Sequence, residues 1–234
     1  MKRWSLLLLA LISLPLQASE IKATTLYYRI SEPGVDPYLS RWLITDQFVR
    51  IDEGDAADNF ILFDRTKRTV YSVVHGDRTV LDIPYRAIDK KPARELKQES
   101  RIVSDNKIPS IDGKKPLFRE LCVNNTLCYS TVSLENLLPD AVKAMAEYRR
   151  VMAGEHAKTL DNTPVEMQQP CELALDIFNP LWSLEKGLPI QEWDTQGKTQ
   201  ALLNYKVSEG VDSALFKLPD EYRHYQTQIL KQSK

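Results

Sequence analysis

The sequence is poor in glycine and histidine, and its longest apolar run is short. Only 8 of its 234 residues are glycine, which argues against the glycine-rich loops that cradle nucleotide phosphates. The three histidines, His75, His156 and His224, form neither a His-Glu-x-x-His motif nor a Cys/His zinc spacing. A Gly-x-Ser-x-Gly nucleophile elbow is also missing. We therefore expect surface histidines and a protein that is not an enzyme and holds no metal and no cofactor.

The longest apolar run is the nine residues Leu6 to Leu14, whereas a transmembrane helix needs about 20. Lys2 and Arg3 precede the run, and a small-residue cleavage site that ends at Ala18 follows it. This order is typical of a secretory signal peptide. We expect residues 1–18 to be cleaved, and the mature protein to be exported to the periplasm of a Gram-negative cell without spanning a membrane.

Neither sign of charge dominates the expected mature chain. Without residues 1–18, 29 Lys and Arg stand against 32 Asp and Glu, and the basic residues are scattered. A nucleic-acid-binding face needs concentrated positive charge, so we expect no nucleic-acid partner. The remaining length of about 216 residues suffices for one hydrophobic core. We therefore expect residues 19–234 to form a single domain.

The first part of the mature chain has the pattern of an antiparallel meander. Six short runs rich in β-branched and aromatic residues follow one another at Ile21–Ser31, Tyr38–Thr45, Gln47–Asp52, Asn59–Phe63, Thr69–Val74 and Arg78–Ile83. Gly76-Asp77 is a hairpin signal between the last two. Such spacing predicts consecutive antiparallel strands and not βαβ units.

Two stretches interrupt the strand pattern in the rest of the chain. Residues 88–115 and 155–170 are charged or polar and are predicted to be loop excursions, the first with a short strand at Leu96–Ser104. Pro116–Leu134 resumes the strand pattern, and Lys198–Ser208 alternates apolar with polar residues. We expect strands in both.

One helix is well specified by its periodicity. A single apolar stripe of helical period is formed by Leu138, Val142, Met145, Tyr148 and Met152. Gly154 is predicted to end the helix. A lone amphipathic helix beside a sheet is expected to cover one face of that sheet.

The three cysteines predict one disulfide in an oxidising compartment. Cys122 and Cys128 flank the tight turn Asn124–Thr126, so their proximity favours a structural bridge between them. The alternative, Cys128–Cys171, would tie the sheet to the segment after the helix and would close a longer loop, which is worth more stability. Cys-x5-Cys is not the Cys-x-x-Cys motif of thiol oxidoreductases.

The order of several short motifs is familiar. The chain opens with Tyr-x-Arg-Ile, Phe-Val-Arg-Ile-Asp-Glu-Gly, Ile-Leu-Phe-Asp and Thr-Val-Tyr-Ser-Val, and closes with Gly-Leu-Pro-Ile, Asp-x-x-Gly-Lys and Phe-Lys-Leu-Pro-Asp-Glu-Tyr. These stretches, Tyr27–Ile83 and Gly187–Tyr222, resemble the LolA/LolB-like superfamily of periplasmic lipoprotein carriers. The resemblance implies an α+β, mainly β fold in which a strongly curved antiparallel sheet, an incomplete barrel, is covered by one or two helices.

The resemblance also implies a function. The half-barrel cavity would shield an acyl chain, a lipid or another apolar ligand, and its partner would be that ligand or a lipid-modified protein. The side chains expected to line the cavity are Tyr28, Ile30, Trp42, Ile44, Phe60, Leu62, Tyr71 and Val73. The alternative is an interaction module that docks a protein of the cell envelope, has a filled core and binds no ligand.

Overall fold

A computed structural model describes residues 19–54, 59–104, 108–111 and 113–227. The expected signal peptide, residues 1–18, lies outside the described residues. Within the described part of the chain, no helix is both long enough and apolar enough to cross a bilayer.

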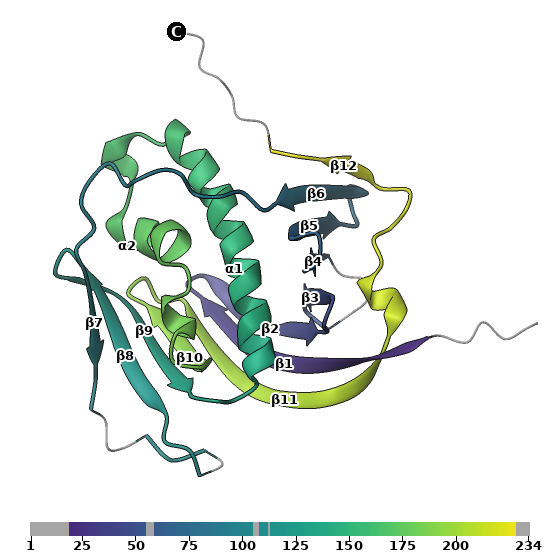
Figure 1. Ribbon diagram of the computed structural model, residues 1–234, viewed down its shortest axis with the longest axis horizontal. Helices are drawn as coiled ribbons and strands as arrows, with labels where there is room; N and C mark the ends of the chain where they lie inside the picture. The colour runs from purple at the N-terminus through teal and green to yellow at the C-terminus, as the bar shows by residue number, and fades with distance from the viewer. Residues whose placement is uncertain (1–18, 55–58, 105–107, 112, 228–234) are drawn as a thin grey trace, which may run out of the picture.

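In the described residues, one open, mixed sheet of 12 strands forms the body of the molecule (Figure 1). Its first six strands in the chain are β1 (Glu20–Glu32), β2 (Val35–Ile44), β3 (Phe48–Asp52), β4 (Phe60–Asp64), β5 (Thr69–Val74) and β6 (Thr79–Pro84). The other six are β7 (Gln98–Ile102), β8 (Leu117–Val123), β9 (Thr126–Leu134), β10 (Leu188–Asp194), β11 (Thr199–Asp212) and β12 (Arg223–Tyr225). Across the sheet the order is β12-β6-β5-β4-β3-β2-β1-β11-β10-β9-β8-β7.

The predicted meander is present, since β1 to β6 are consecutive neighbours. All pairs are antiparallel except β12 with β6, which makes the sheet mixed and not purely antiparallel. β1 also pairs along most of its length with β11, from Glu20 opposite Asp212 to Ser31 opposite Thr199. This long-range pairing joins the two ends of the chain, and it places the later strands beside the N-terminal meander.

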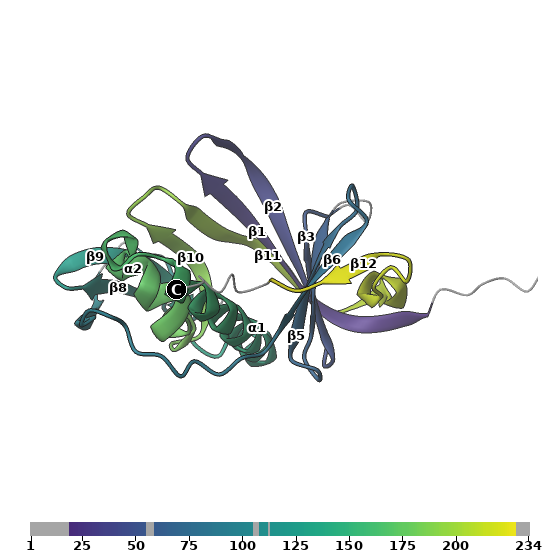
Figure 2. The same cartoon turned by 90° about the horizontal axis from the view of Figure 1, so that it is seen from above.

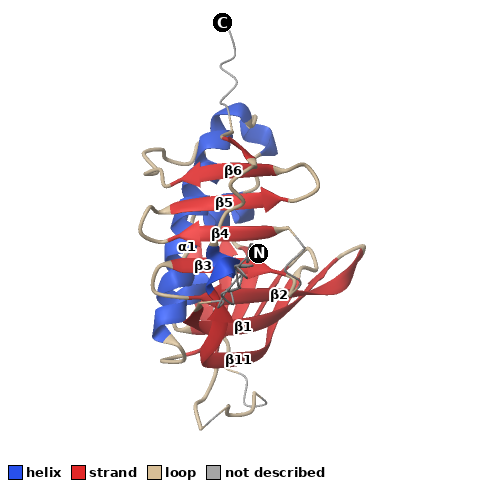
Figure 3. Cartoon of the chain, turned by 90° about the vertical axis from the view of Figure 1, so that its right-hand side faces the viewer, coloured by secondary structure: helices blue, strands red, loops and turns tan. Residues whose placement is uncertain are grey.

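The helix α1 (Pro139–Thr159) covers one face of the sheet (Figures 1 and 2). Seen from the side, it lies behind β3 to β6 (Figure 3). Its buried Ala141, Ala144, Met145 and Val151 pack against the core residues of β1 to β6. The predicted mainly β character with helical cover is therefore confirmed.

The prediction that Gly154 ends the helix is wrong, because α1 continues to Thr159. A Cβ atom at position 154 would lie 2.5 Å from the carbonyl oxygen of Arg86. The glycine therefore serves the close passage of the chain after β6 and not the end of the helix. Consequently residues 155–170 are not a loop throughout: they hold the last turn of α1, and the short 3₁₀ turns η1 (Leu160–Asn162) and η2 (Val165–Met167).

The remaining helical elements lie between α1 and β10, and after β11. They are α2 (Pro170–Glu172), the π-helical turn η3 (Leu173–Phe178), and the 3₁₀ turns η4 (Trp182–Leu184) and η5 (Ser213–Phe216). The strand predicted inside residues 88–115 is present as β7.

The disulfide joins Cys128 to Cys171, so the predicted Cys122–Cys128 pairing is wrong and the alternative pairing is the one present. A bulge in the β8–β9 hairpin places Cys122 opposite Leu127 and not opposite Cys128. Cys128 packs with Trp182 on one face of the sheet. Leu121 and Val123, the residues on either side of Cys122 in the chain, lie on this same face. Strand alternation therefore turns Cys122 to the other face, where it is a buried free thiol.

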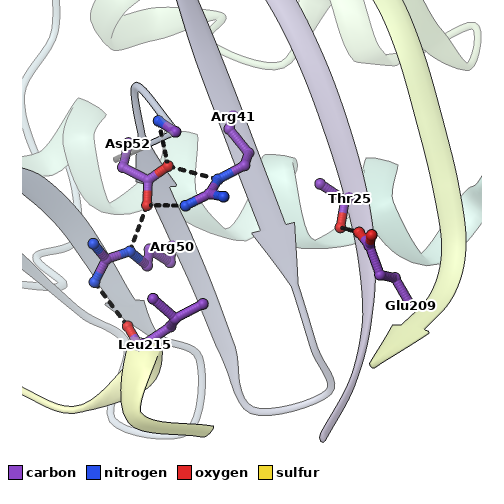
Figure 4. A network of polar contacts seen from close by, with 7 residues as sticks. Thr25, Arg41, Arg50, Asp52, Glu209 and Leu215 are labelled. Carbon is purple, nitrogen blue, oxygen red and sulfur yellow. Dashed lines mark hydrogen bonds and ion pairs between the residues drawn. The ribbon is translucent and has the colours of Figure 1, made fainter. Parts of the chain in front are cut away.

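A buried ion network lies on the face of the sheet that points away from α1 (Figure 4). Asp52 accepts hydrogen bonds from Arg41 Nε and Nη2 at 2.8 and 2.9 Å and from Arg50 Nε at 2.6 Å. Arg50 Nη1 donates to the carbonyl oxygen of Leu215 at 2.9 Å. Burial alone would raise the pKa of Asp52, but the two arginines outweigh it and lower this pKa below its ordinary value. The network ties β2 and β3 to the C-terminal segment.

Candidate functional site

The eight residues predicted to line one cavity lie on two faces of the sheet. Four are buried beneath α1: Tyr28, Ile30, Trp42 and Ile44. The other four pack on the opposite face, beside Phe216 of η5: Phe60, Leu62, Tyr71 and Val73. The prediction of a common cavity wall is wrong because strand alternation separates the two sets: Phe63 faces α1, while its neighbour Leu62 faces η5.

Protein side chains fill the space beneath α1. The rings of Trp42 and Phe63 pack edge-on against Tyr148 of α1, with centroid separations of 5.6 and 6.2 Å. Tyr28 is 0% exposed, and its hydroxyl donates to the carbonyl oxygen of Pro189 at 3.1 Å. The region where a half-barrel would hold its ligand is thus occupied by the protein's own core.

A cleft of about 530 Å³ opens beside α1 instead. One wall comes from α1, through Tyr148, Arg149, Met152 and His156. The facing wall comes from the segment after the disulfide, through Cys171, Glu172, Leu175, Asp176, Pro180 and Ser183. β9 and the β10–β11 turn complete the cleft with Cys128, Tyr129, Asp194, Thr195, Gln196 and Lys198.

The disulfide and the π-helical turn place the second wall. Figures 1 and 2 show the helical segment around α2 next to α1, over β8 to β10. The Cys128–Cys171 bond attaches this segment to β9, and Leu173, Ala174 and Ile177 are buried beneath it. Asp176 is left exposed on the cleft side. Single π-helical turns are rare and occur frequently at functional sites.

An ion pair forms the base of the cleft. Arg149 Nη1 donates to Ser183 Oγ at 2.6 Å, and Arg149 Nη2 lies 3.5 and 3.4 Å from the two carboxylate oxygens of Glu192. Glu192 is 2% exposed and also accepts a hydrogen bond from Gln200 Nε2 at 3.2 Å. Burial would lower the pKa of Arg149, but the charge of Glu192 leads the effects that raise it above its ordinary value. Arg149 is therefore a permanent cation.

The mouth of the cleft carries further charged groups. The cleft walls partly remove water from around the Asp176 carboxyl, and this desolvation raises its pKa. The charges of His156, Lys198 and Arg149 act in the opposite direction. Lys198 Nζ lies 2.6 Å from Glu32 Oε1, on the β1–β2 hairpin. Asp194 Oδ1 accepts the backbone N–H groups of Gln196 and Lys198 at 2.8 and 2.9 Å, which shapes the β10–β11 turn.

Of the three histidines, His156 alone lies on the cleft. His75 Nδ1 is 2.8 Å from the Tyr222 hydroxyl, and His224 Nδ1 is 2.7 Å from Asp82 Oδ1. Both therefore serve the docking of the C-terminal segment. In the described part of the chain, no three His, Cys, Asp or Glu side chains are grouped so that they could hold a metal ion.

Sequence reasoning missed the ion pair at the base of this cleft. Arg149 comes directly after Tyr148, a member of the apolar stripe of α1, and its position in the sequence is that of a solvated helix residue. Glu192 offers a faint signal, since it is a charged residue at a buried position of a strand. Asp176 carries no signal at all, because its π-helical turn has no distinctive sequence pattern.

No protein-family model and no curated protein sequence matches the chain. Among solved structures, an uncharacterized conserved protein from Thermus thermophilus is 7% identical, with a TM-score of 0.45 over 88% of this chain and 91% of that one. Two crystal forms of PNGF-II are 11% and 10% identical, with TM-scores of 0.44 and 0.38 over 90% and 88% of this chain. The chain spans only 32% of the PNGF-II chains. At these scores the likeness says nothing about function.

Proposed function

We propose that this protein is a non-enzymatic binding protein of the Gram-negative periplasm that shelters the apolar part of a small ligand in the cleft beside α1. The observation that carries the proposal is the cleft itself, whose volume of about 530 Å³ lies in the usual range for ligand sites. Its lining combines apolar side chains, among them Tyr129, Met152 and Leu175, with six acidic or basic side chains. Such a mixture suits a ligand with an apolar body and a polar end.

The proposal places the ligand beside α1 and not beneath it. In this view the sheet is a strongly curved incomplete barrel of the LolA/LolB-like kind, and α1 is its plug. The arrangement of β3 to β6 and of β8 to β10 on the two sides of α1 supports this view (Figure 1). Because Tyr28 and Trp42 fill the space beneath α1, the proposed ligand site lies beside the helix.

Export is part of the proposal. It is supported by the signal-like pattern of residues 1–18 and by the Cys128–Cys171 disulfide, since such bonds persist in oxidising compartments. In the proposal Arg149 is a fixed part of the cleft wall, because Ser183 and Glu192 hold its guanidinium.

The proposal is tested by what the protein carries. The full-length gene is expressed, the protein is purified from the periplasm and denatured, and the organic extract is analysed by mass spectrometry. We expect a small molecule in stoichiometric amount from the wild-type protein and little from Met152→Trp, whose larger side chain fills the cleft. A folded wild-type protein that carries nothing, and that also fails to bind an environment-sensitive fluorophore, contradicts the proposal.

A second candidate function, docking of an envelope protein, is favoured by the free edge of the sheet. β12 covers β6 at one end, whereas β7 is the last strand at the other end and all five of its residues are exposed. Ile102 is 68% exposed on this edge. An uncovered edge strand can pair with a strand of a partner. Pull-down from envelope extract with wild-type protein and with an Ile102→Lys variant, which places a charge on the exposed edge, tests this function.

A further inference from the structure

The β7 edge of the sheet is uncovered among the described elements. β7 is the last strand in the sheet order, and Figure 1 shows no other labelled element on its outer side. All five of its residues are exposed, and none of them is a proline. The backbone groups along such an edge form a template on which another strand can pair.

β7 is held firmly on its inner side and on one face. It pairs with β8 along its whole length. On the face that carries Trp182, the indole Nε1 of Trp182 donates to Ser100 Oγ at 3.1 Å, and Asn179 Nδ2 donates to Gln98 Oε1 at 2.8 Å. The strand is therefore presented in a fixed conformation, which lowers the entropy that a pairing partner must overcome.

The pairing with β8 determines which backbone groups of β7 point to the open edge. Just beyond β7 the N–H of Val103 donates to the carbonyl oxygen of Phe118, in the same antiparallel register as the strand. Hydrogen-bonded and non-hydrogen-bonded pairs alternate along such a ladder, so the odd-numbered residues bond to β8. The N–H and C=O groups of Gln98, Ser100 and Ile102 consequently point to the open edge.

The charges of β7 complement those of an antiparallel second copy of the same strand. With Ser100 at the centre of the pairing, Gln98 of one copy lies opposite Ile102 of the other, and the outward-pointing groups of both strands meet. Glu99 of each copy then lies opposite Arg101 of the other, in a non-hydrogen-bonded pair, where cross-strand side chains are closest. Opposite charges in such a pair stabilise a sheet.

The same two side chains disfavour the neighbouring registers. The outward-pointing groups of two copies meet only if the register shifts by an even number of residues. A shift by two residues in one direction places Glu99 opposite its counterpart in the other copy, and a shift in the other direction does the same for Arg101. Like charges directly opposite each other are destabilising. β7 therefore favours a single register for pairing with itself.

From these observations we infer that the protein forms a symmetric dimer in which the β7 strands of two copies pair antiparallel and join their sheets. Within one copy, Arg101 Nη2 lies 3.0 Å from Glu120 Oε2, and the guanidinium has further N–H groups for a second carboxylate. Ile102, which is 68% exposed, loses contact with water beside Gln98 of the other copy. The dimer is independent of the cleft beside α1, and it occupies the edge that the second candidate function would use.

Sedimentation velocity of the full chain purified from the periplasm, over a range of concentrations, tests the inference. Because only five residues of each copy pair, the interface is small, and we expect a dissociation constant on the order of 10 μM. Glu99→Arg and Arg101→Glu each place like charges opposite one another in the dimer. Each variant alone is expected to dimerise at least about tenfold more weakly than the wild-type protein.

An equimolar mixture of the two variants is expected to dimerise like the wild-type protein. In the mixed dimer each side chain at position 99 again faces the opposite charge at position 101 of the other copy. Glu166→Arg is the matched control, because it makes the same change of charge at an exposed position outside β7. It is expected to dimerise like the wild-type protein.

Amide hydrogen exchange of the wild-type protein locates the interface without any variant. On dimerisation we expect slower exchange at the amides of Gln98, Ser100 and Ile102, which point to the open edge. The amides of Glu99 and Arg101 bond to β8 in the monomer as well, so their exchange should change little. This alternation distinguishes strand pairing from a contact elsewhere on the molecule.

Three outcomes overturn the inference. The first is a wild-type protein that stays monomeric over the whole concentration range, which leaves the edge open for the second candidate function. The second is a dimer without slower exchange at the three outward-pointing amides, since its interface then lies elsewhere. The third is a mixture of the two folded variants that does not dimerise, or a Glu166→Arg variant that loses the dimer, since the charges of β7 then do not specify the pairing. None of these outcomes affects the proposed ligand cleft.

Discussion

Arg149 of α1 and Glu192 of β10 meet at 3.4 Å at the base of the cleft, and Glu192 is almost completely buried. Removing the cation leaves a buried carboxylate with no charge partner, which is strongly destabilising. We predict that Arg149→Met lowers the free energy of unfolding by about 3 kcal/mol. The double variant Arg149→Met/Glu192→Leu should recover part of this loss, because two apolar residues need no partner. Urea denaturation of the three proteins measures both effects, and a double variant less stable than Arg149→Met contradicts the account.

Asp52 makes the free energy of unfolding depend on pH in the acid range, because its folded-state pKa lies below the ordinary value of 3.8. A lowered carboxyl pKa contributes stability that is present above 3.8 and is lost as the pH falls through the lower, folded-state value. We predict that Asp52→Asn costs about 3 kcal/mol at neutral pH, because it leaves Arg41 and Arg50 without their anion. The difference between the two proteins should shrink below pH 3.8. Denaturant melts over a pH series test this, and a difference that stays constant contradicts it.

The chain that passes close to Gly154 leaves no room for a Cβ atom there, since an added Cβ would lie 2.5 Å from the Arg86 carbonyl oxygen. Alanine is normally the better helix former, so helix propensity alone predicts a gain in stability from Gly154→Ala. We predict a loss of about 1–3 kcal/mol instead, the usual cost of overpacking. Gly76→Ala is the control, because open space surrounds Gly76. Thermal unfolding of both variants decides, and a stabilised Gly154→Ala contradicts the account.

Local pattern predicts much of the fold but not the site. The meander from β1 to β6 follows from short apolar runs and turn signals, which act between neighbours in the chain. The pairing of β1 with β11 and the closeness of Arg149 to Glu192 depend on how distant segments meet. Alternation is also ambiguous about which face is buried: Leu203 and Val207 of β11 fit the pattern, yet they are 57% and 58% exposed.

The Cys128–Cys171 disulfide fixes one wall of the cleft to β9. The bond links two residues that are 43 positions apart in the sequence. Its removal should therefore lower the free energy of unfolding by about 2–4 kcal/mol. We predict that a reductant lowers the melting temperature of the wild-type protein and also that of Cys122→Ala, because Cys122 takes no part in the disulfide. Cys128→Ser/Cys171→Ser should melt at this lower temperature with or without reductant. A loss of the reductant effect in Cys122→Ala contradicts this pairing.

The central claim is that the ligand site is the cleft beside α1. Titration of an environment-sensitive fluorophore into Met152→Trp and Leu203→Trp tests it most directly, because Met152 lines the cleft and Leu203 lies exposed on β11. The account predicts that Met152→Trp weakens binding by at least about tenfold, while Leu203→Trp binds like the wild-type protein. Equal binding by a correctly folded Met152→Trp would contradict the account.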